Sequence, residues 1–211
     1  MPRDRDVAAF DERAPGYESG WRGRLHHEIA DRSAGIASAC APAPDRVLDV
    51  GCGTGYLLRR LASLFPGAGT LDGVDAAPGM IQVARSAGTD PRLRFTVGTA
   101  EHLPYDDGRF DLVVSTTSFD HWRDQRAGLA ECARVLRPGG QLVLCDQFSA
   151  WLLPTLTGSR RSKARTRRRA TALLAAAGFT APVWHDVYTV LIRAVTATRT
   201  DADPKRPASS R

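Results

Sequence analysis

The sequence predicts an α/β fold in which helices cover both faces of a parallel, doubly wound sheet. Two observations support this fold class. Short apolar strands alternate with amphipathic helices from residue 46 onward, and a glycine-rich turn joins the first strand directly to a helix. Such alternation is typical of βαβ units, whose strands run parallel. The chain has 211 residues, 43% of them hydrophobic, which suffices for about one domain with a sizeable core.

The segment before the first strand is predicted to be a helical extension. Residues 1–12 look frayed, whereas residues 17–39 place Trp21, Leu25, Ile29 and Ile36 on one helical face. Prolines at positions 42 and 44 end this helix. We therefore expect an N-terminal cap over residues 1–40, one domain over residues 41–198 and a disordered basic tail over residues 199–211.

Strand and helix patterns then follow in regular order. Strands are predicted at 46–50, 70–75, 93–97, 110–115, 141–146, 183–187 and 190–198. Helices are predicted at 56–65, 78–87, 126–136 and 165–177, with proline or glycine at most of their ends. No internal repeat or linker divides this series.

Composition narrows the class of protein. No apolar run approaches the ~18 residues of a membrane helix, and the charged N-terminus does not resemble a signal peptide. We expect a soluble, cytoplasmic protein. Its four cysteines lack metal-ligand spacing, so we expect free thiols and no metal site. Much of the basic excess behind the net charge of +6 lies in Arg160–Arg169 and the tail. That run is either a solvated helix start or a site for an acidic group, and the lack of interleaved aromatic residues favours the former.

The glycine loop after the first strand is the most informative motif. Val47–Val50 leads into Gly51-Cys52-Gly53-Thr54-Gly55, and Tyr56 stands where a dinucleotide fingerprint has its third glycine. The loop therefore need not hold a pyrophosphate. Asp75 ends the second strand, twenty residues after Gly55. A carboxylate there can accept both hydroxyls of a ribose, which suits either an NAD site or an adenosyl site.

Four segments carry a resemblance to a known family. They are VLDVGCGTGYLL at 47–58, GVDAAPGMIQVAR at 73–85, GTAEHLPYDDGRFDLVVS at 98–115 and ECARVLRPGGQLVL at 131–144. In this order and spacing they resemble the motifs of class I S-adenosylmethionine-dependent methyltransferases, most closely the small type-11 group. The resemblance covers about residues 10–198. It implies a Rossmann-like sheet of seven strands, the last antiparallel, and S-adenosyl-L-methionine as cofactor with S-adenosyl-L-homocysteine as product.

The resemblance also implies cofactor-binding residues. Gly51, Gly53 and Gly55 would pack under the methionine part and the ribose with Cys52 between them, and Asp49 would place the ammonium. Asp75 would hold the ribose hydroxyls, while Ala76 and Met80 lie against the adenine. The remaining implied contacts are Thr99, Ala100 and Glu101 at the adenine amino group, Ser115 and Thr116 along the methionine tail, and Tyr17 closing over the cofactor. Thr99 departs from the family pattern, since many relatives have an aspartate there.

Acceptor-side residues are expected in the loop after the fourth strand. His121 is a candidate catalytic base, because histidine side chains can exchange a proton under physiological conditions, with Asp120 orienting it or acting itself. Trp21, Phe119, Phe148 and Trp151 are candidates for a roof over a flat, apolar substrate. For each of these residues the alternative is simple packing, in the core or at a helix start. His26, His27 and His185 are expected to serve surface or packing roles.

Three functions remain open at this point. The first is methylation of a small-molecule acceptor, and the second is methylation of RNA or another macromolecule. The chain is short for a macromolecular target surface, and Ser115–Ser118 replaces the tetrapeptide typical of nucleic-acid N-methylation in the family, so nucleic acid is not the expected partner. The third is a non-catalytic protein that binds the cofactor. An NAD-dependent oxidoreductase fits least because of Tyr56.

Overall fold

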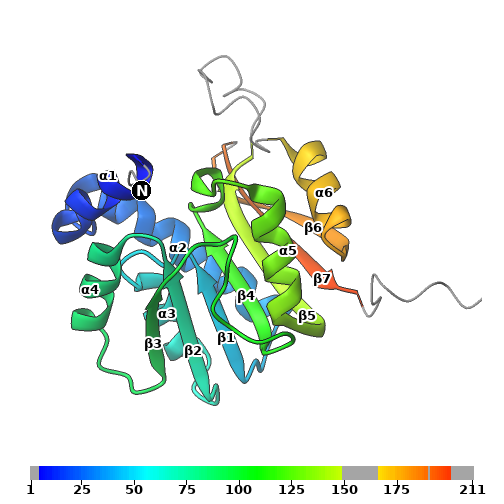
Figure 1. Ribbon diagram of the computed structural model, residues 1–211, viewed down its shortest axis with the longest axis horizontal. Coiled ribbons are helices and arrows are strands. Elements are labelled where there is room, and N and C mark those ends of the chain that lie inside the picture. The colour runs from blue at the N-terminus through cyan, green and yellow to red at the C-terminus, as the bar shows by residue number, and fades with distance from the viewer. Residues whose placement is uncertain (1–4, 149–165, 190, 201–211) are drawn as a thin grey trace, which may run out of the picture.

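A computed structural model describes residues 5–148, 166–189 and 191–200. Its centre is a seven-stranded sheet in the order β3-β2-β1-β4-β5-β7-β6 (Figure 1). The strands are β1 (Arg46–Val50), β2 (Thr70–Asp75), β3 (Leu93–Val97), β4 (Phe110–Thr116), β5 (Leu136–Gln147), β6 (Phe179–Tyr188) and β7 (Ile192–Arg199). Strand β7 pairs antiparallel with both β5 and β6, and the other pairs are parallel. The predicted seven-stranded fold with an antiparallel last strand is confirmed.

Helices cover both faces of this sheet. They are α1 (Arg5–Arg13), α2 (Gly20–Cys40), α3 (Tyr56–Leu64), α4 (Pro78–Ala87), α5 (Gln125–Val135) and α6 (Arg167–Ala176), with short 3-10 turns η1 (Ala14–Gly16) and η2 (Phe119–His121). One core cluster joins α2, α3 and α4 to the sheet through residues such as Ala34, Leu58 and Ile81. A second joins α5 and α6 to the opposite face through Leu129 and Leu174. In Figure 1, α5 accordingly lies in front of the strands and α3 behind them.

The expectation of a frayed N-terminus is wrong for residues 5–13, which form α1. Val7 and Phe10 pack with Ala14, Ala77 and Met80 in a small apolar cluster. Contacts with α4 therefore hold a short helix that would be marginal alone.

Element boundaries differ most from the prediction at the starts of β5 and β6. The helix predicted over 126–136 was expected to end at Arg137–Gly140, but β5 begins at Leu136, which pairs with Phe110 at the start of β4. The register shifts between Phe110 and Leu112, so this stretch is an irregular continuation of the strand. Strand β6 likewise begins at Phe179 rather than Val183. In each case sheet pairing extends a strand past residues that favour turns.

The topology brings the carboxyl ends of β1, β2 and β4 to one edge of the sheet. The backbone N–H groups of Gly51 and Cys52 both donate to the carbonyl of Val74, which ties the loop after β1 to β2. Helix α1 and the start of α2 lie over this edge (Figure 1). Within the described ranges, no helix is both long and apolar enough to cross a bilayer, and no group of three or more His, Cys, Asp or Glu residues has the arrangement of a metal site.

Candidate active site

The glycine loop has a conformation that side chains resist. Gly51, Gly53 and Gly55 have φ values of 75°, 53° and 79°, in the left-handed region. A Cβ on Gly51 would meet the Ser118 side chain 1.8 Å away, and one on Gly55 would meet Phe95 at 2.7 Å. A Cβ on Gly53 would meet nothing within 4 Å. Gly51 and Gly55 are thus restricted by protein neighbours, and Gly53 faces open space.

Asp75 is fixed by the backbone on either side of it. Its Oδ2 accepts a hydrogen bond from the Gly53 N–H at 2.9 Å, and its Oδ1 accepts one from the Ala77 N–H at 2.8 Å. Burial raises the pKa of Asp75, and these backbone donors partly offset the rise. The carboxylate is therefore held in one orientation at the end of β2, beside the glycine loop.

Two cavities adjoin at this edge. The large cavity measures about 610 Å³ and the small cavity about 70 Å³. The large volume lies within the range of ligand pockets in proteins, ~300–1,000 Å³. Both cavities are lined by Tyr17, Gly51, Gly53, Thr116 and Thr117, so the glycine loop forms their common wall.

The large cavity extends from Asp75 toward α1 and the loop after β4. Its remaining wall is made by Val7, Phe10, Val74, Asp75, Ala76, Ala77, Met80, Gly98, Thr99, Ala100, Glu101, His102, Ser118, His121, Trp122, Arg123, Asp124 and Ala127. Most of these residues are apolar, and Asp75 is the acid at the end of β2. The arrangement suits a flat, largely apolar group with a few hydroxyls.

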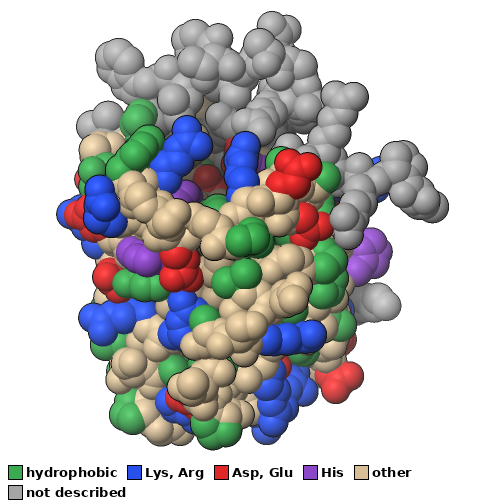
Figure 2. Space-filling view, turned by 90° about the vertical axis from the view of Figure 1, so that its left-hand side faces the viewer, with side chains coloured by type: hydrophobic (Ala, Val, Ile, Leu, Met, Phe, Trp, Pro, Cys, Tyr) green, Lys and Arg blue, Asp and Glu red, His purple; other side chains and the backbone are tan. Residues whose placement is uncertain are grey.

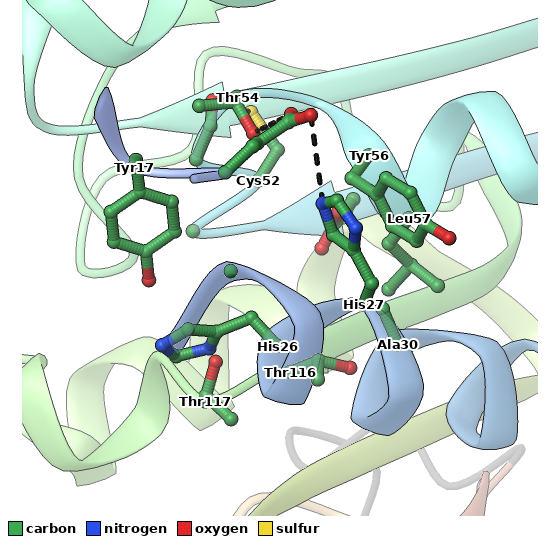
Figure 3. A pocket seen from close by; sticks show the side chains of 15 residues that line it. Tyr17, His26, His27, Ala30, Cys52, Thr54, Tyr56, Leu57, Thr116 and Thr117 are labelled. Carbon is green, nitrogen blue, oxygen red and sulfur yellow. Dashed lines mark hydrogen bonds and ion pairs between the residues drawn. The ribbon is translucent and has the colours of Figure 1, made fainter. Parts of the chain in front are cut away.

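Asp49 lines the small cavity. Figure 3 shows His26 and His27 from α2 facing Cys52 and Thr54 of the glycine loop across this cavity. Asp49 is 2% exposed, and its Oδ1 has no hydrogen-bond partner among the described residues. Burial, and secondarily the nearby Asp75, raise the pKa of Asp49 to about 8. The Thr116 hydroxyl is also buried without a partner in the described part of the chain. Buried oxygen atoms without a hydrogen-bond donor are costly, so they indicate that a ligand supplies the missing cation or donor.

A cap formed by α1, η1 and the start of α2 covers both cavities. The Phe10 ring meets His121 edge-on at 5.0 Å between centroids, and the Tyr17 ring lies 5.1 Å from that of His26. Burial and the nearby Asp75 raise the pKa of the Tyr17 hydroxyl, which keeps it a neutral donor. Aromatic rings thus line the cap where it faces the two cavities.

Polar contacts hold this cap to the domain. Asp11 accepts a hydrogen bond from the Gly79 N–H at 2.8 Å, at the N-terminus of α4. Glu18 accepts hydrogen bonds from Thr54 and Arg59. Burial by itself would raise the pKa of Glu18, but these hydrogen bonds outweigh it and lower the pKa. Glu18 therefore stays ionised and links the cap to the glycine loop.

The structure brings together most of the residues predicted for cofactor binding. Those that line a cavity are Tyr17, Asp49, Gly51, Cys52, Gly53, Asp75, Ala76, Met80, Thr99, Ala100, Glu101 and Thr116. Gly55 and Ser115 line neither cavity: Gly55 packs against Phe95, and Ser115 is buried within β4. Of the candidate catalytic pair, His121 lines the large cavity, whereas Asp120 does not.

The candidate substrate residues lie elsewhere. Phe119 and Phe148 are core residues with 1% and 2% exposure, and their rings pack against each other. Trp21 is 64% exposed on α2 and lines neither cavity. Trp151 lies outside the described residues. Among the described residues, the aromatic wall is therefore made by Phe10, Tyr17, His121 and Trp122 instead.

Several cavity residues were not predicted. His26 and His27 were expected on the surface or in packing, but both line the small cavity together with Glu18. Val7 and Phe10 lie in the stretch expected to fray, yet they line the large cavity. The available signal was the i, i+3 spacing of Val7 and Phe10, which puts two apolar side chains on one face of a short helix.

Comparison with known proteins now identifies the family. A family model described as "Methyltransferase domain" matches residues 48–144. The malonyl-[acyl-carrier protein] O-methyltransferase of Geobacter sulfurreducens is 35% identical over 185 residues, which cover 81% of this chain and 68% of that protein. The chain belongs to the class I S-adenosylmethionine-dependent methyltransferases. The cofactor of this family is S-adenosylmethionine. In this chain the glycine loop lines both adjoining cavities, and Asp75 lines the large one.

Other similarities agree with this assignment. The demethylmenaquinone methyltransferase of Deinococcus radiodurans is 39% identical over 133 residues, covering 62% of this methyltransferase and 51% of the relative. The structure of the PH0226 protein from Pyrococcus horikoshii has the same fold, with a TM-score of 0.74 at 20% identity over 88% of this chain and 96% of that one. Against three of the curated relatives, the chain spans only 32%, 51% and 36% of their length.

Proposed function

We propose that this chain transfers the methyl group of S-adenosylmethionine to a small-molecule acceptor that enters the large cavity beside His121. The observation that carries the proposal is the junction of the two cavities at the glycine loop. Asp75 lies on one side of that junction and the unpartnered Asp49 on the other. An adenosyl group and an amino-acid tail need such a divided site.

The residues present fit the cofactor. Open space beside Gly53 lets a ligand lie against the backbone. The oriented carboxylate of Asp75 suits the two ribose hydroxyls, and Ala76, Met80 and Ala100 supply apolar surface for the adenine. In the small cavity, Asp49 would bind the ammonium group and so gain the cation that its buried carboxylate lacks.

The cofactor supplies a methyl group already activated on a positively charged sulfur. The task of the chain is therefore to hold the acceptor in line and to exclude water. Positioning of this kind lowers a barrier by up to ~7–11 kcal/mol. The cap provides it here, because Phe10 and Tyr17 close the wall opposite the strand ends.

His121 is the proposed base for acceptors that must lose a proton. It lines the large cavity from η2, and Phe10 limits how its ring can turn. A base in this position contributes ~10² to 10⁴-fold. An acceptor that reacts without losing a proton would not require it.

A small-molecule acceptor fits the surface better than a nucleic acid. On the face that Figure 2 shows, Lys and Arg side chains are scattered among acidic and uncharged ones rather than gathered into a basic stripe. The relatives named above methylate demethylmenaquinone and malonyl-[acyl-carrier protein], by their names. The basic run Arg160–Arg169 lies largely outside the described residues, so its role stays a prediction.

Thermal unfolding with and without ligand tests the proposal. S-adenosylhomocysteine at about one hundred times its Kd should stabilise the protein by ~2.7 kcal/mol, and NAD should not. Asp75→Asn keeps one carbonyl acceptor for the loop but loses the charge, so it should weaken the stabilisation by S-adenosylhomocysteine. Asp106→Asn, the same change at an exposed turn, should leave it intact. Stabilisation by NAD, or equal shifts in both variants, would contradict the assignment.

A further inference from the structure

The small cavity contains more charged and titratable groups than an ammonium group requires. Besides Asp49, its wall includes Glu18, His26 and His27, the last two on adjacent positions of α2 (Figure 3). The amino-acid tail of the cofactor carries a carboxylate as well as an ammonium. Asp49 can bind only the ammonium, so the carboxylate needs a different partner in the same cavity.

His27 already lies between an aromatic ring and a carboxylate, although its Nε2 forms no hydrogen bond with a described residue. The His27 ring stacks on Tyr56 with centroids 3.8 Å apart, and its Nε2 lies 3.5 Å from a Glu18 oxygen. Figure 3 draws this ion pair as a dashed line. Glu18 is also bound by Thr54 and Arg59. These groups hold one another in place at the end of the cavity nearest α3.

His26 differs from its neighbour. Within the described residues it forms no ion pair; its ring contact is with Tyr17, 5.1 Å away and tilted by 30°. It lines the small cavity and not the large one, which places it on the tail side of the glycine loop and away from His121. Because an imidazole can become a cation, His26 can pair with an anion that enters the cavity.

We propose that His26 binds the carboxylate of the cofactor's amino-acid tail as a protonated imidazolium, while Asp49 binds the ammonium of the same tail. The inference rests on the proposed function, and it assigns His26 a role in recognising the tail. Two opposite charges on the ligand would then meet two opposite charges of the protein within one small cavity.

The surroundings of His26 make this pairing depend on a proton. Burial, and then electrostatic interactions with His27 and Arg22 on its own helix, lower the pKa of His26. From other elements, Tyr17, Glu18 and Asp49 also face the small cavity. An entering carboxylate favours the charged imidazole, so tail binding should draw a proton onto His26.

Calorimetry with two ligands separates this role from a packing role. S-adenosylhomocysteine has the amino-acid tail, and 5′-methylthioadenosine keeps the adenosine and the thioether without it. His26→Gln keeps a hydrogen-bond donor but cannot become charged. We expect this variant to bind S-adenosylhomocysteine about tenfold more weakly at pH 6, and by less as the pH rises. Its affinity for 5′-methylthioadenosine should be unchanged.

Proton uptake on ligand binding gives a second measurement. Titrations in buffers of different ionisation enthalpy measure the protons taken up or released on binding. The protons released from Asp49 are measured in His26→Gln and subtracted from the wild-type value. After this correction, wild-type protein should take up more protons with S-adenosylhomocysteine than with 5′-methylthioadenosine. His185→Gln, on β6 beside Thr196, is the matched control and should behave as wild type.

The possible failures are distinguishable. Equal weakening of both ligands in His26→Gln, or a loss of affinity that does not change with pH, would overturn the role of His26. Failure of wild-type protein to bind either ligand would instead remove the cofactor assignment on which the inference rests.

Discussion

At the scale of single residues, Asp49 shows how burial produces a binding group. It lies on β1 among Leu48 and Val50, where a strand residue is normally apolar. Its carboxyl has little water and an unpartnered oxygen, so the ionised form is unstable until a cation arrives. Two buried acids, Asp49 and Asp75, then favour a ligand that carries positive charge.

Asp49 makes the stability of the ligand-free protein depend on pH. Its pKa rises from an ordinary value of 3.8 to about 8 on folding. Between those values the folded state holds a proton that the unfolded state has lost, so stability falls as pH rises. Asp49→Asn should reduce the slope of unfolding free energy by up to about 1.4 kcal/mol per pH unit.

Urea unfolding at several pH values between 5 and 8 measures that slope. Asp106→Asn is the control, because Asp106 is exposed and should keep the wild-type slope. A slope in Asp49→Asn equal to that of wild type would show that Asp49 is already ionised in the folded protein.

At the scale of elements, the N-terminal cap packs on the sheet edge and continues through α2 into the core. Its polar attachments are Asp11 to α4 and Glu18 to Thr54 and Arg59. Both attachments reach segments that also hold the cofactor site, since α4 follows Asp75 and Thr54 lies in the glycine loop. Undocking of the cap should therefore open both cavities together.

Asp11→Ala tests this coupling. The change removes the acceptor from the first turn of α4 and should cost about 1 kcal/mol, as loss of a helix cap does. We expect faster amide hydrogen exchange in α1 and faster release of S-adenosylhomocysteine, with exchange in β1 and β4 unchanged. Glu12→Ala, at an exposed position of the same helix, should change neither rate. Unchanged exchange in α1 after Asp11→Ala would mean that the hydrogen bond of Asp11 to α4 does not hold the cap in place.

At the scale of the whole molecule, two apolar layers hold the sheet between them. Phe110 is fully buried in the layer under α5 and meets the Tyr105 ring edge-on at 4.9 Å. This position lies at the amino end of β4, away from the strand ends that form the site. Packing and ligand recognition are therefore carried by opposite ends of the same strand.

Phe110→Ala should consequently reduce stability without altering recognition. Loss of a buried phenylalanine costs ~3–5 kcal/mol, which urea unfolding would measure. Affinity for S-adenosylhomocysteine should stay at the wild-type value below the unfolding transition. Val183→Ala, at a position 54% exposed on β6, should change stability by less than ~0.5 kcal/mol. A similar small change for Phe110→Ala would contradict the assignment of this residue to the core.

Local patterns in the sequence were sufficient to predict most helices and strands of the fold. Strands β1 and β2 have the predicted bounds because their apolar runs stop at glycine and aspartate. Leu136 was predicted to end a helix, and Arg137–Gly140 to close it, because Pro138-Gly139-Gly140 favours a helix end; pairing with β4 makes this stretch a strand. Helix α1 was missed because contacts with α4 hold it.

The residues of the candidate site also differ in whether the sequence could predict them. The glycine loop and Asp75 stand in contiguous motifs and could be predicted, as could Thr99–Glu101. His26 could not, because the small cavity is formed by α2 together with Thr116, ninety residues later in the chain. Phe148 was a candidate for a roof over the substrate, but it packs against Phe119 and Trp184 in the core. Such contacts between distant segments leave no local pattern.

Asp75 has one more consequence. Because the Gly53 and Ala77 N–H groups already grip its two oxygens, the carboxylate has no rotational freedom left to lose when a sugar docks. In the role proposed for Asp75, much of the entropic cost of binding the ribose is therefore met while the chain folds. Ligands that differ only in their sugar hydroxyls should then be discriminated chiefly by enthalpy, since an absent hydroxyl leaves this rigid acceptor with nothing to replace it.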